Sequence, residues 1–203
     1  MAVEPGVEIK RLNLGCGRNI LPGWVNLDRQ AGAGVDAVAD LDECAKTRLP
    51  FDDDTFDEIL ASHVFEHLQH PLPFMQELHR VAKIGCKAVF KTPYGSSDDA
   101  FEDPTHCRLC FLNTFAFFSQ PWFWRADYGY RGDWKVDHIR LLVSRARYQG
   151  KTVDEIMSDV MRLRNVVEEM VVDLLAVKPI REPKQELHTP ASLEIVLIDS
   201  VKR

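Results

Sequence analysis

Short blocks of hydrophobic residues alternate with turn-forming residues along most of this chain, which predicts strands separated by loops and helices. Seven blocks have the length and composition of strands, near residues 11–15, 24–28, 35–39, 56–61, 86–92, 135–144 and 193–198. A helix is predicted over about 71–83, because its apolar residues recur at helical spacing and Gly85 follows the last of them. This alternation is typical of an α/β fold with a doubly wound, mostly parallel sheet.

A second helix is predicted over residues 151–177, ahead of the last strand. Thr152 and Glu155 form the pattern of a capping box. Apolar residues then follow at alternating spacings of three and four, at Val153, Ile156, Val160, Leu163, Val167, Met170 and Leu174. Such a long amphipathic helix would either pack on its own sheet or form a homodimer through residues 152–175.

Aromatic residues are most frequent between the fifth and sixth predicted strands, in residues 95–135. A loop at 95–99 is followed by Phe101, Phe111, Phe115, Phe117, Phe118, Trp122, Phe123, Trp124, Tyr128, Tyr130 and Trp134. Basic residues are interleaved with the later aromatics, which is a pattern that can bind single-stranded nucleic acid. Asp127, Asp133 and Asp137 dilute this charge, so a surface with salt bridges is the favoured interpretation.

The first strand runs directly into Gly15-Cys16-Gly17, and Asp28 ends the second strand. Glycines allow the backbone to turn sharply and a ligand to approach closely. A carboxylate at the tip of the neighbouring strand can accept hydrogen bonds from two vicinal hydroxyls, as on a ribose. The pair predicts a nucleoside site at the carboxyl ends of the strands. A nicotinamide dinucleotide is disfavoured, because position 20 is Ile and no long helix follows Gly17.

Further stretches follow this pair in a characteristic order, at residues 38–41, 49–57, 61–67 and 77–81. Together with residues 12–17 and Asp28, they resemble the class I S-adenosylmethionine-dependent methyltransferases (methyltransferase type 11-like) over roughly residues 9–118. The resemblance implies a Rossmann-like sheet with an antiparallel edge strand and S-adenosyl-L-methionine as cofactor. It implies these cofactor-binding residues: Asn13, Gly15, Cys16, Gly17, Asp28, Asp40, Leu41, Ser62 and His63. Asp40 would bind the adenine amino group, although a turn or helix cap is the alternative.

The chain departs from the family pattern in two places. Asn13 stands where the family often has an acid, so it can hydrogen-bond there but carries no charge. Only a few residues separate Gly17 from the second strand, so a short turn closed by Pro22 and Gly23 replaces the usual helix. The glycine turn and Asp28 are unaffected by either change.

The segment Asp103-Pro-Thr-His106-Cys-Arg108 resembles a stretch found after the fifth strand in related methyltransferases. His106 would serve as general base near neutral pH, and Arg108 would bind an anionic group or hold Asp103. A structural network that fixes the loop is an equally supported interpretation. The resemblance also places the substrate pocket or its lid in residues 95–150.

Metal ligation is not predicted, although His63 and His67 are spaced to share a helical face. Cys107 and Cys110 form one Cys-x-x-Cys without a clear second pair, so the thiols are expected to be unligated. Asp52, Asp53 and Asp54 lack the other ligands of a calcium loop and are interpreted as a turn.

Composition predicts one domain over residues 1–203. The formal net charge of −6 argues against bulk binding to nucleic acid. No leader-like start and no apolar run of membrane-spanning length are seen, and the five cysteines are odd in number. These features predict a cytoplasmic protein with reduced thiols and no membrane contact.

Three functions remain open from the sequence. The favoured one is in-line methyl transfer to a small molecule, a sugar or a carrier-bound acceptor. DNA amino-methylation is disfavoured, because residues 61–64 are Ala-Ser-His-Val and not Asp/Asn-Pro-Pro-Tyr, and no Pro-Cys dipeptide supports cytosine chemistry. The alternatives are a non-catalytic S-adenosylmethionine-binding protein that serves a protein partner and, less favoured, a nicotinamide-dependent oxidoreductase.

Overall fold

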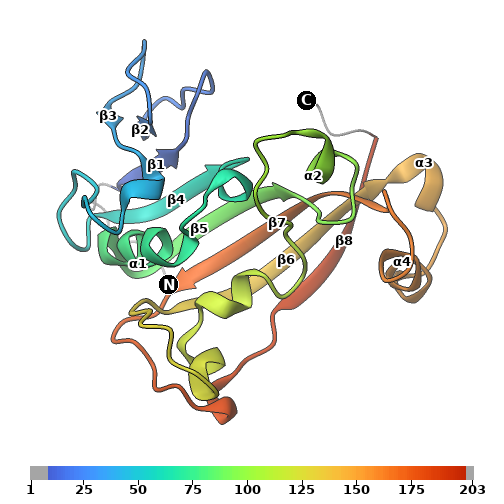
Figure 1. Cartoon of the computed structure of the whole chain (residues 1–203). Coiled ribbons are helices and arrows are strands. Elements are labelled where there is room, and N and C mark those ends of the chain that lie inside the picture. The colour runs from blue at the N-terminus through green and yellow to red at the C-terminus, as the bar shows by residue number, and fades with distance from the viewer. Residues whose placement is uncertain (1–8, 200–203) are drawn as a thin grey trace.

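One eight-stranded sheet organises the molecule, in the order β3-β2-β1-β4-β5-β7-β6-β8 (Figure 1). The computed structural model describes residues 9–199. The strands are β1 (Arg11–Leu14), β2 (Val25–Asp28), β3 (Ala37–Val38), β4 (Phe56–Ser62), β5 (Ala82–Pro93), β6 (Trp134–Ser144), β7 (Val167–Ala176) and β8 (Ser192–Ile198). All seven predicted strands are present, and the Rossmann-like, mostly parallel α/β fold is confirmed.

The antiparallel strand lies inside the sheet and not at its edge. Strands β1 to β5 pair in parallel, whereas β7 is antiparallel to both β5 and β6. The edge on that side is β8, which pairs in parallel with β6. The expected antiparallel edge strand is therefore corrected: a strand not predicted from the sequence takes the interior position, and β8 closes the sheet beyond it.

That interior strand occupies part of the segment for which one long helix was predicted. Helix α4 (Val153–Val160) begins with the expected capping box, in which Thr152 N donates to Glu155 Oε2 at 2.7 Å. The helix ends there, and Asn165 has a left-handed φ of 59° shortly before β7. The predicted helix over 151–177 is wrong beyond residue 160. The predicted homodimer through residues 152–175 was based on one continuous apolar seam along a helix, and the structure does not have that helix.

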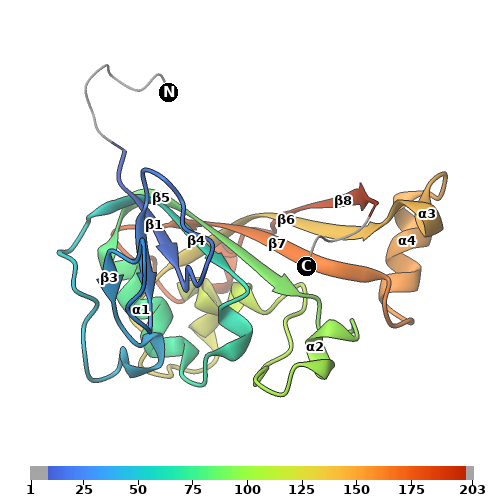
Figure 2. The ribbon, with the colours of Figure 1, turned by 90° about the horizontal axis from the view of Figure 1, so that it is seen from above.

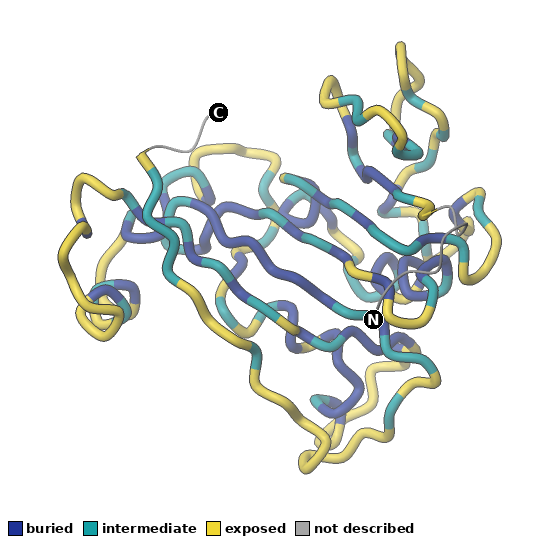
Figure 3. The backbone as a smooth tube through the Cα atoms, turned by 180° about the vertical axis from the view of Figure 1, so that it is seen from behind, coloured by how far each residue is buried: buried dark blue, intermediate teal, exposed yellow. Residues whose placement is uncertain are grey.

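Helices cover a single face of the sheet in the part of the chain that the structure describes. Helix α1 (Pro71–Val81) and the segment between β5 and β6 lie on the same side (Figure 2). The connections from β1 to β2 and from β2 to β3 contain no helix. The other face of the sheet, which Figure 3 shows from behind, therefore has no helical cover from the described residues. That face carries ion pairs, among them Lys87–Asp173 at 2.9 Å and Arg11–Glu58 at 2.7 Å. These charged side chains allow the face to contact water although no helix of residues 9–199 covers it.

The aromatic segment supplies much of the core on the covered face. Five of its aromatic side chains are buried, namely Phe115, Phe118, Phe123, Tyr130 and Trp134. The short elements α2 (Asp99–Glu102), η3 (Phe115–Phe118) and η4 (Gln120–Trp124) carry the segment along the sheet. Phe101, Phe111, Phe117, Trp124 and Tyr128 remain exposed. Part of the expected lid is therefore core.

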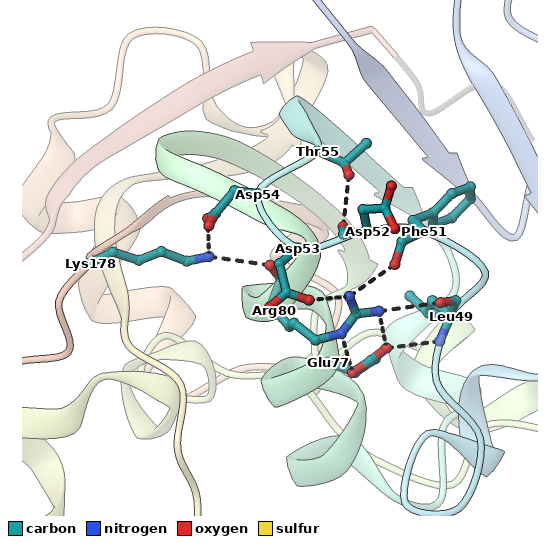
Figure 4. Close-up of polar contacts among 9 residues, drawn as sticks. All are labelled: Leu49, Phe51, Asp52, Asp53, Asp54, Thr55, Glu77, Arg80 and Lys178. Carbon is teal, nitrogen blue, oxygen red and sulfur yellow. Dashed lines mark hydrogen bonds and ion pairs between the residues drawn. The ribbon is translucent and has the colours of Figure 1, made fainter.

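The acidic turn before β4 is held by ion pairs at the end of the sheet away from the glycine turn (Figure 4). Arg80 of α1 donates to Asp53 Oδ1 at 2.7 Å and to the Phe51 carbonyl at 2.9 Å. Lys178, just after β7, donates to Asp54 Oδ1 at 2.5 Å. The turn predicted at residues 52–54 thus joins α1 and β7. Among residues 9–199, no helix is long and apolar enough to cross a membrane.

Candidate active site

The glycine turn after β1 makes a cradle that only glycine fits. Gly15 and Gly17 have left-handed φ values of 56° and 49°. A Cβ added to Gly15 would lie 2.5 Å from Cγ2 of Val64, which is far inside normal contact distance. The turn is held to β2 by the Cys16 N–H, which donates to the Leu27 carbonyl at 3.0 Å. Only glycine therefore allows this turn to adopt its left-handed backbone and to pack against Val64.

Asp28 closes the other side of this turn from the end of β2. Its Oδ2 accepts from Gly17 N at 2.8 Å, and its Oδ1 accepts from Gln30 N at 3.0 Å. A carboxylate has about four acceptor positions, so both oxygens retain capacity for ligand hydroxyls. The two backbone bonds fix the carboxylate at the turn, where a ribose would meet it.

These residues line an open pocket of about 200 Å³ at the carboxyl ends of the parallel strands. We call it the nucleoside pocket. Its lining includes Gly15, Asp28, Asp40, Leu41 and His63 of the predicted cofactor set. Asp40 also caps the short helix η1 (Leu41–Glu43), because its Oδ1 accepts from Asp42 N at 3.0 Å. The two interpretations of Asp40 are thus compatible: it caps the helix and faces the pocket.

His63 stands at the end of β4 with a left-handed φ of 54°, which is uncommon for a residue with a Cβ. Its Nε2 lies 2.9 Å from Glu169 Oε1, and its Nδ1 lies 3.3 Å from Glu66 Oε1. Hydrogen bonds to Glu169 and then Glu66 raise the pKa of His63 to about 10. The imidazole is therefore a cation at neutral pH and cannot accept a proton there.

We expect NMR titration of the His63 ring protons to show a midpoint well above 8. Glu169→Gln should move this pKa down toward 6.5, because the stronger of the two partners loses its charge. Since folding raises the pKa, the pair stabilises the fold fully below pH 6.5, and this contribution is lost as the pH rises through about 10. The exposed His70 serves as internal control, and a His63 midpoint near 6.5 in the unsubstituted protein would contradict the assignment.

A second, polar pocket of about 300 Å³ lies against the nucleoside pocket, at the ends of β5, β6 and β7. His63 and Glu169 belong to its wall, and so do Asp98, Arg147 and Asn165. Asn165 Nδ2 donates to Asp98 Oδ2 at 2.7 Å, and Asp98 N donates to Asn165 Oδ1 at 2.6 Å. These two hydrogen bonds join segments that are distant in sequence, and they fix the loop after β5 against the start of β7. His63 lines both pockets, so they share one wall.

Comparison with known proteins places this site in a family. Residues 12–90 match the family model described as a methyltransferase domain, and this range contains the glycine turn, Asp28, Asp40 and His63. Over this range the chain is similar to the class I S-adenosylmethionine-dependent methyltransferases. S-adenosylmethionine is the cofactor of this family, and the glycine cradle with Asp28 fits its nucleoside part.

Solved structures share this methyltransferase fold at low sequence identity. A SAM-dependent methyltransferase from Archaeoglobus fulgidus aligns with a TM-score of 0.56 at 15% identity, covering 82% of this chain and 86% of that chain. The [4+2]-cyclase SpnF gives 0.53 at 14% identity, with 85% and 75% covered. The YcgJ protein from Bacillus subtilis gives 0.51 at 14% identity, with 84% and 92% covered. A search of curated proteins found no match.

Four of the residues that the methyltransferase resemblance assigned to the cofactor, namely Asn13, Cys16, Gly17 and Ser62, do not line the nucleoside pocket. Asn13 is buried, and its Nδ2 donates to Asn26 Oδ1 at 3.0 Å and to the Asn19 carbonyl at 2.8 Å. It therefore holds the turn from behind. Cys16 is buried, and burial raises the pKa of its thiol. Ser62 ends β4 beside His63 without lining the pocket. Gly17 contributes through its bond to Asp28.

The Asp103–Arg108 segment packs beside η2 (Phe65–His67), next to the nucleoside pocket but outside the linings of both pockets. Arg108 Nε donates to the Leu68 carbonyl at 2.8 Å and does not hold Asp103. Asp103 Oδ1 instead accepts from Thr105 N at 2.8 Å. His106 Nε2 lies 3.9 Å from Asp103 Oδ2. This arrangement fixes the loop, and the role of His106 as a base stays a prediction.

Glu169 and Glu66 are the functional candidates that the sequence did not identify. Both are buried carboxylates that contact the His63 ring. Glu66 was three residues from His63, a spacing that offered a local signal. Glu169 lies 106 residues away, in the strand that was predicted as helix, so no local pattern indicated it.

Proposed function

We propose that the protein transfers a methyl group from S-adenosylmethionine to a small polar acceptor bound in the second pocket. The observation that carries the proposal is the wall shared through His63: the predicted cofactor site and a polar cavity adjoin at one residue. When bound, the cofactor supplies an electrophilic methyl group on a sulfonium. The protein supplies orientation of the two ligands and exclusion of water.

The residues divide between the two ligands. Gly15 admits the nucleoside, Asp28 accepts from ribose hydroxyls, and Asp40 and Leu41 lie at the adenine. His63 is a cation at neutral pH, so a proton released by the acceptor goes to a carboxylate of the second pocket. Glu169 is the nearest choice, because it faces that pocket and contacts the His63 ring. The His63 charge also holds Glu169 in place for this role.

The second pocket favours an acceptor with amine or hydroxyl groups over one with carboxylate or phosphate groups. Four carboxylate residues line it, namely Asp98, Asp99, Glu168 and Glu169, together with the cations His63 and Arg147, and Arg164 pairs with Asp98 at 2.7 Å. An anionic acceptor would meet net repulsion in this pocket. Among the acceptor classes left open by the sequence, we therefore place amines and sugars first.

Calorimetric titration with S-adenosylhomocysteine tests the cofactor half of the proposal. We expect micromolar-range binding that weakens at least about tenfold in Asp28→Ala, because a hydrogen bond to a charged group contributes about 1.5–3 kcal/mol. Asp28→Asn, which keeps the shape, should weaken binding less. Asp127→Ala removes an exposed acid distant from both pockets and should leave binding unchanged.

The acceptor half is tested by transfer of a labelled methyl group to panels of amines, sugars and carboxylates. Preferred labelling of amines or sugars supports the proposal, and preferred labelling of anions contradicts the acceptor class. Because one of the structures with this fold is a [4+2]-cyclase, the fold alone does not establish methyl transfer. Tight cofactor binding without any labelling would favour the non-catalytic alternative.

A further inference from the structure

We propose that Glu66, His67 and His106 form a binding site for a divalent first-row transition-metal ion at the border of the nucleoside pocket. The site was not predicted from the sequence, which gave no metal ligands. It goes beyond the proposed methyl transfer and does not depend on it. One carboxylate and two imidazoles are a ligand set that zinc and iron(II) use in catalytic sites, with positions left open for other ligands.

The three side chains converge from two segments. Glu66 and His67 belong to η2, and His106 comes from the loop after α2. Their ligand atoms all lie within 4.8 Å of one another. Ligands about 2.1 Å from a shared tetrahedral ion are roughly 3.4 Å apart, so small side-chain rotations would complete the site. The rings of His67 and His106 already lie with centroids 4.7 Å apart.

Two members of the site have buried polar atoms without a hydrogen-bond partner among the described residues. Glu66 is 2% exposed; its Oε1 lies 3.3 Å from His63 Nδ1, and its Oε2 has no partner among those residues. The Nδ1 atom of His106 is also buried without a hydrogen-bond partner among these residues. A buried carboxylate without hydrogen bonds is strongly destabilising unless a cation neutralises it. These groups indicate a bound cation that nitrogen and oxygen atoms can coordinate.

The nearby His63 does not satisfy this need by itself. Its ring lies 3.3 Å from Glu66 Oε1 and 2.9 Å from Glu169 Oε1, so one ring is shared by two carboxylates and Glu66 Oε2 is left without a hydrogen-bond partner among the described residues. Arg108 is directed to the Leu68 carbonyl and lies over the Phe65 ring, with its guanidinium carbon 5.4 Å from the ring centroid.

A hydrogen-bond relay fixes the tautomer of His67 that a metal ligand needs. Thr105 Oγ1 donates its only proton to Asp103 Oδ1 at 2.6 Å. The same oxygen lies 2.9 Å from His67 Nδ1 and must therefore accept the Nδ1 proton. This tautomer leaves the lone pair of His67 on Nε2, free for a metal. Metal-binding histidines typically have such a partner on the second nitrogen. The relay gives Asp103 and Thr105 a positioning role.

Calorimetry of the chelator-treated protein with Zn²⁺, together with the absorption spectrum of the Co²⁺ form, tests the site. We expect one ion per chain, bound more tightly than Mg²⁺ or Ca²⁺, with Co²⁺ bands of nitrogen and oxygen ligation. His106→Ala and His67→Asn should each weaken Zn²⁺ binding more than tenfold. His70→Ala, which removes an exposed neighbouring histidine, should leave it unchanged.

Equal Zn²⁺ affinity in all four proteins would overturn the proposal. A Co²⁺ thiolate band that disappears in Cys107→Ser would also overturn it, because the ion would then bind the nearby thiol. Glu66→Gln tests the carboxylate directly, and if that variant fails to fold, the two histidine variants decide. S-adenosylhomocysteine titration of His106→Ala, a residue outside the lining of the nucleoside pocket, confirms that this pocket is intact. Loss of Zn²⁺ binding in His106→Ala with that titration unchanged separates the metal site from the proposed methyl transfer.

Discussion

Gly15→Ala is expected to reduce S-adenosylhomocysteine affinity at least about tenfold, which corresponds to about 1.4 kcal/mol. Two effects combine at this position. The left-handed backbone, with φ of 56°, adds about 1–2 kcal/mol of strain for a residue with a Cβ. The new methyl would also lie 2.5 Å from Val64 Cγ2, and Val64 itself lines the nucleoside pocket. The turn must move, and with it the position of the ligand. Calorimetric titration measures the loss.

Two further variants separate strain from steric conflict. Gly23→Ala has the same handedness, with φ of 76°, but its Cβ would meet no atom within 4 Å. We expect it to lower stability by about 1 kcal/mol without changing cofactor affinity. Val64→Ala combined with Gly15→Ala should recover part of the lost affinity, because the conflicting methyl group is removed. Full affinity in Gly15→Ala alone would show that the cofactor does not use this cradle.

The nucleoside pocket was predictable because its signals are local. A strand followed by two glycines needs only neighbouring residues to specify a sharp turn, and Asp28 ends the next strand along the chain. Parallel pairing then brings both strand ends to one edge, as the register of Leu14 with Leu27 shows. The same locality explains the success of the capping box at Thr152. In each case the residues that define the feature are close in sequence.

Strand β7 was not predictable from spacing, because a central strand is buried on both faces. Its residues Val167, Met170 and Leu174 are fully buried, and their positions continue a heptad pattern that begins in the helix α4. The β-branched residues and the continuous apolar run from 170 to 172 favoured a strand. Only the tertiary position, between β5 and β6, resolves the two interpretations.

The polar contacts of His63 illustrate the same limit at the site. The histidine itself was predicted at the mouth of the pocket, and it lies there. Its charge state depends on Glu169, which reaches it only because β7 pairs antiparallel with β5. Of the two roles predicted for Arg108, holding Asp103 is not found, because Arg108 donates instead to the carbonyl of Leu68, the residue after η2. Long-range packing decides which partners are available.

Trp134→Ala should lower the free energy of unfolding by about 3–5 kcal/mol, a large part of the 5–15 kcal/mol typical of a domain. Trp134 is fully buried at the start of β6, and its Nε1 donates to the Met75 carbonyl of α1 at 3.0 Å. Its ring also meets His79 edge to face, with centroids 5.7 Å apart. The side chain therefore joins the helix layer to the sheet, and its loss leaves a cavity between them.

Urea unfolding followed by far-ultraviolet circular dichroism measures this loss independently of tryptophan fluorescence. Trp134→Phe keeps most of the volume but removes the bond to Met75, so it should lower stability by about 1 kcal/mol. Trp124→Ala, at an exposed position of the same segment, should stay within about 0.5 kcal/mol of the unsubstituted protein. Similar losses in Trp124→Ala and Trp134→Ala would contradict the division of the aromatic segment into a buried and an exposed set. The expected ranking follows from the burial of Trp134 and its bond to Met75, because the two side chains are chemically identical and differ only in their surroundings.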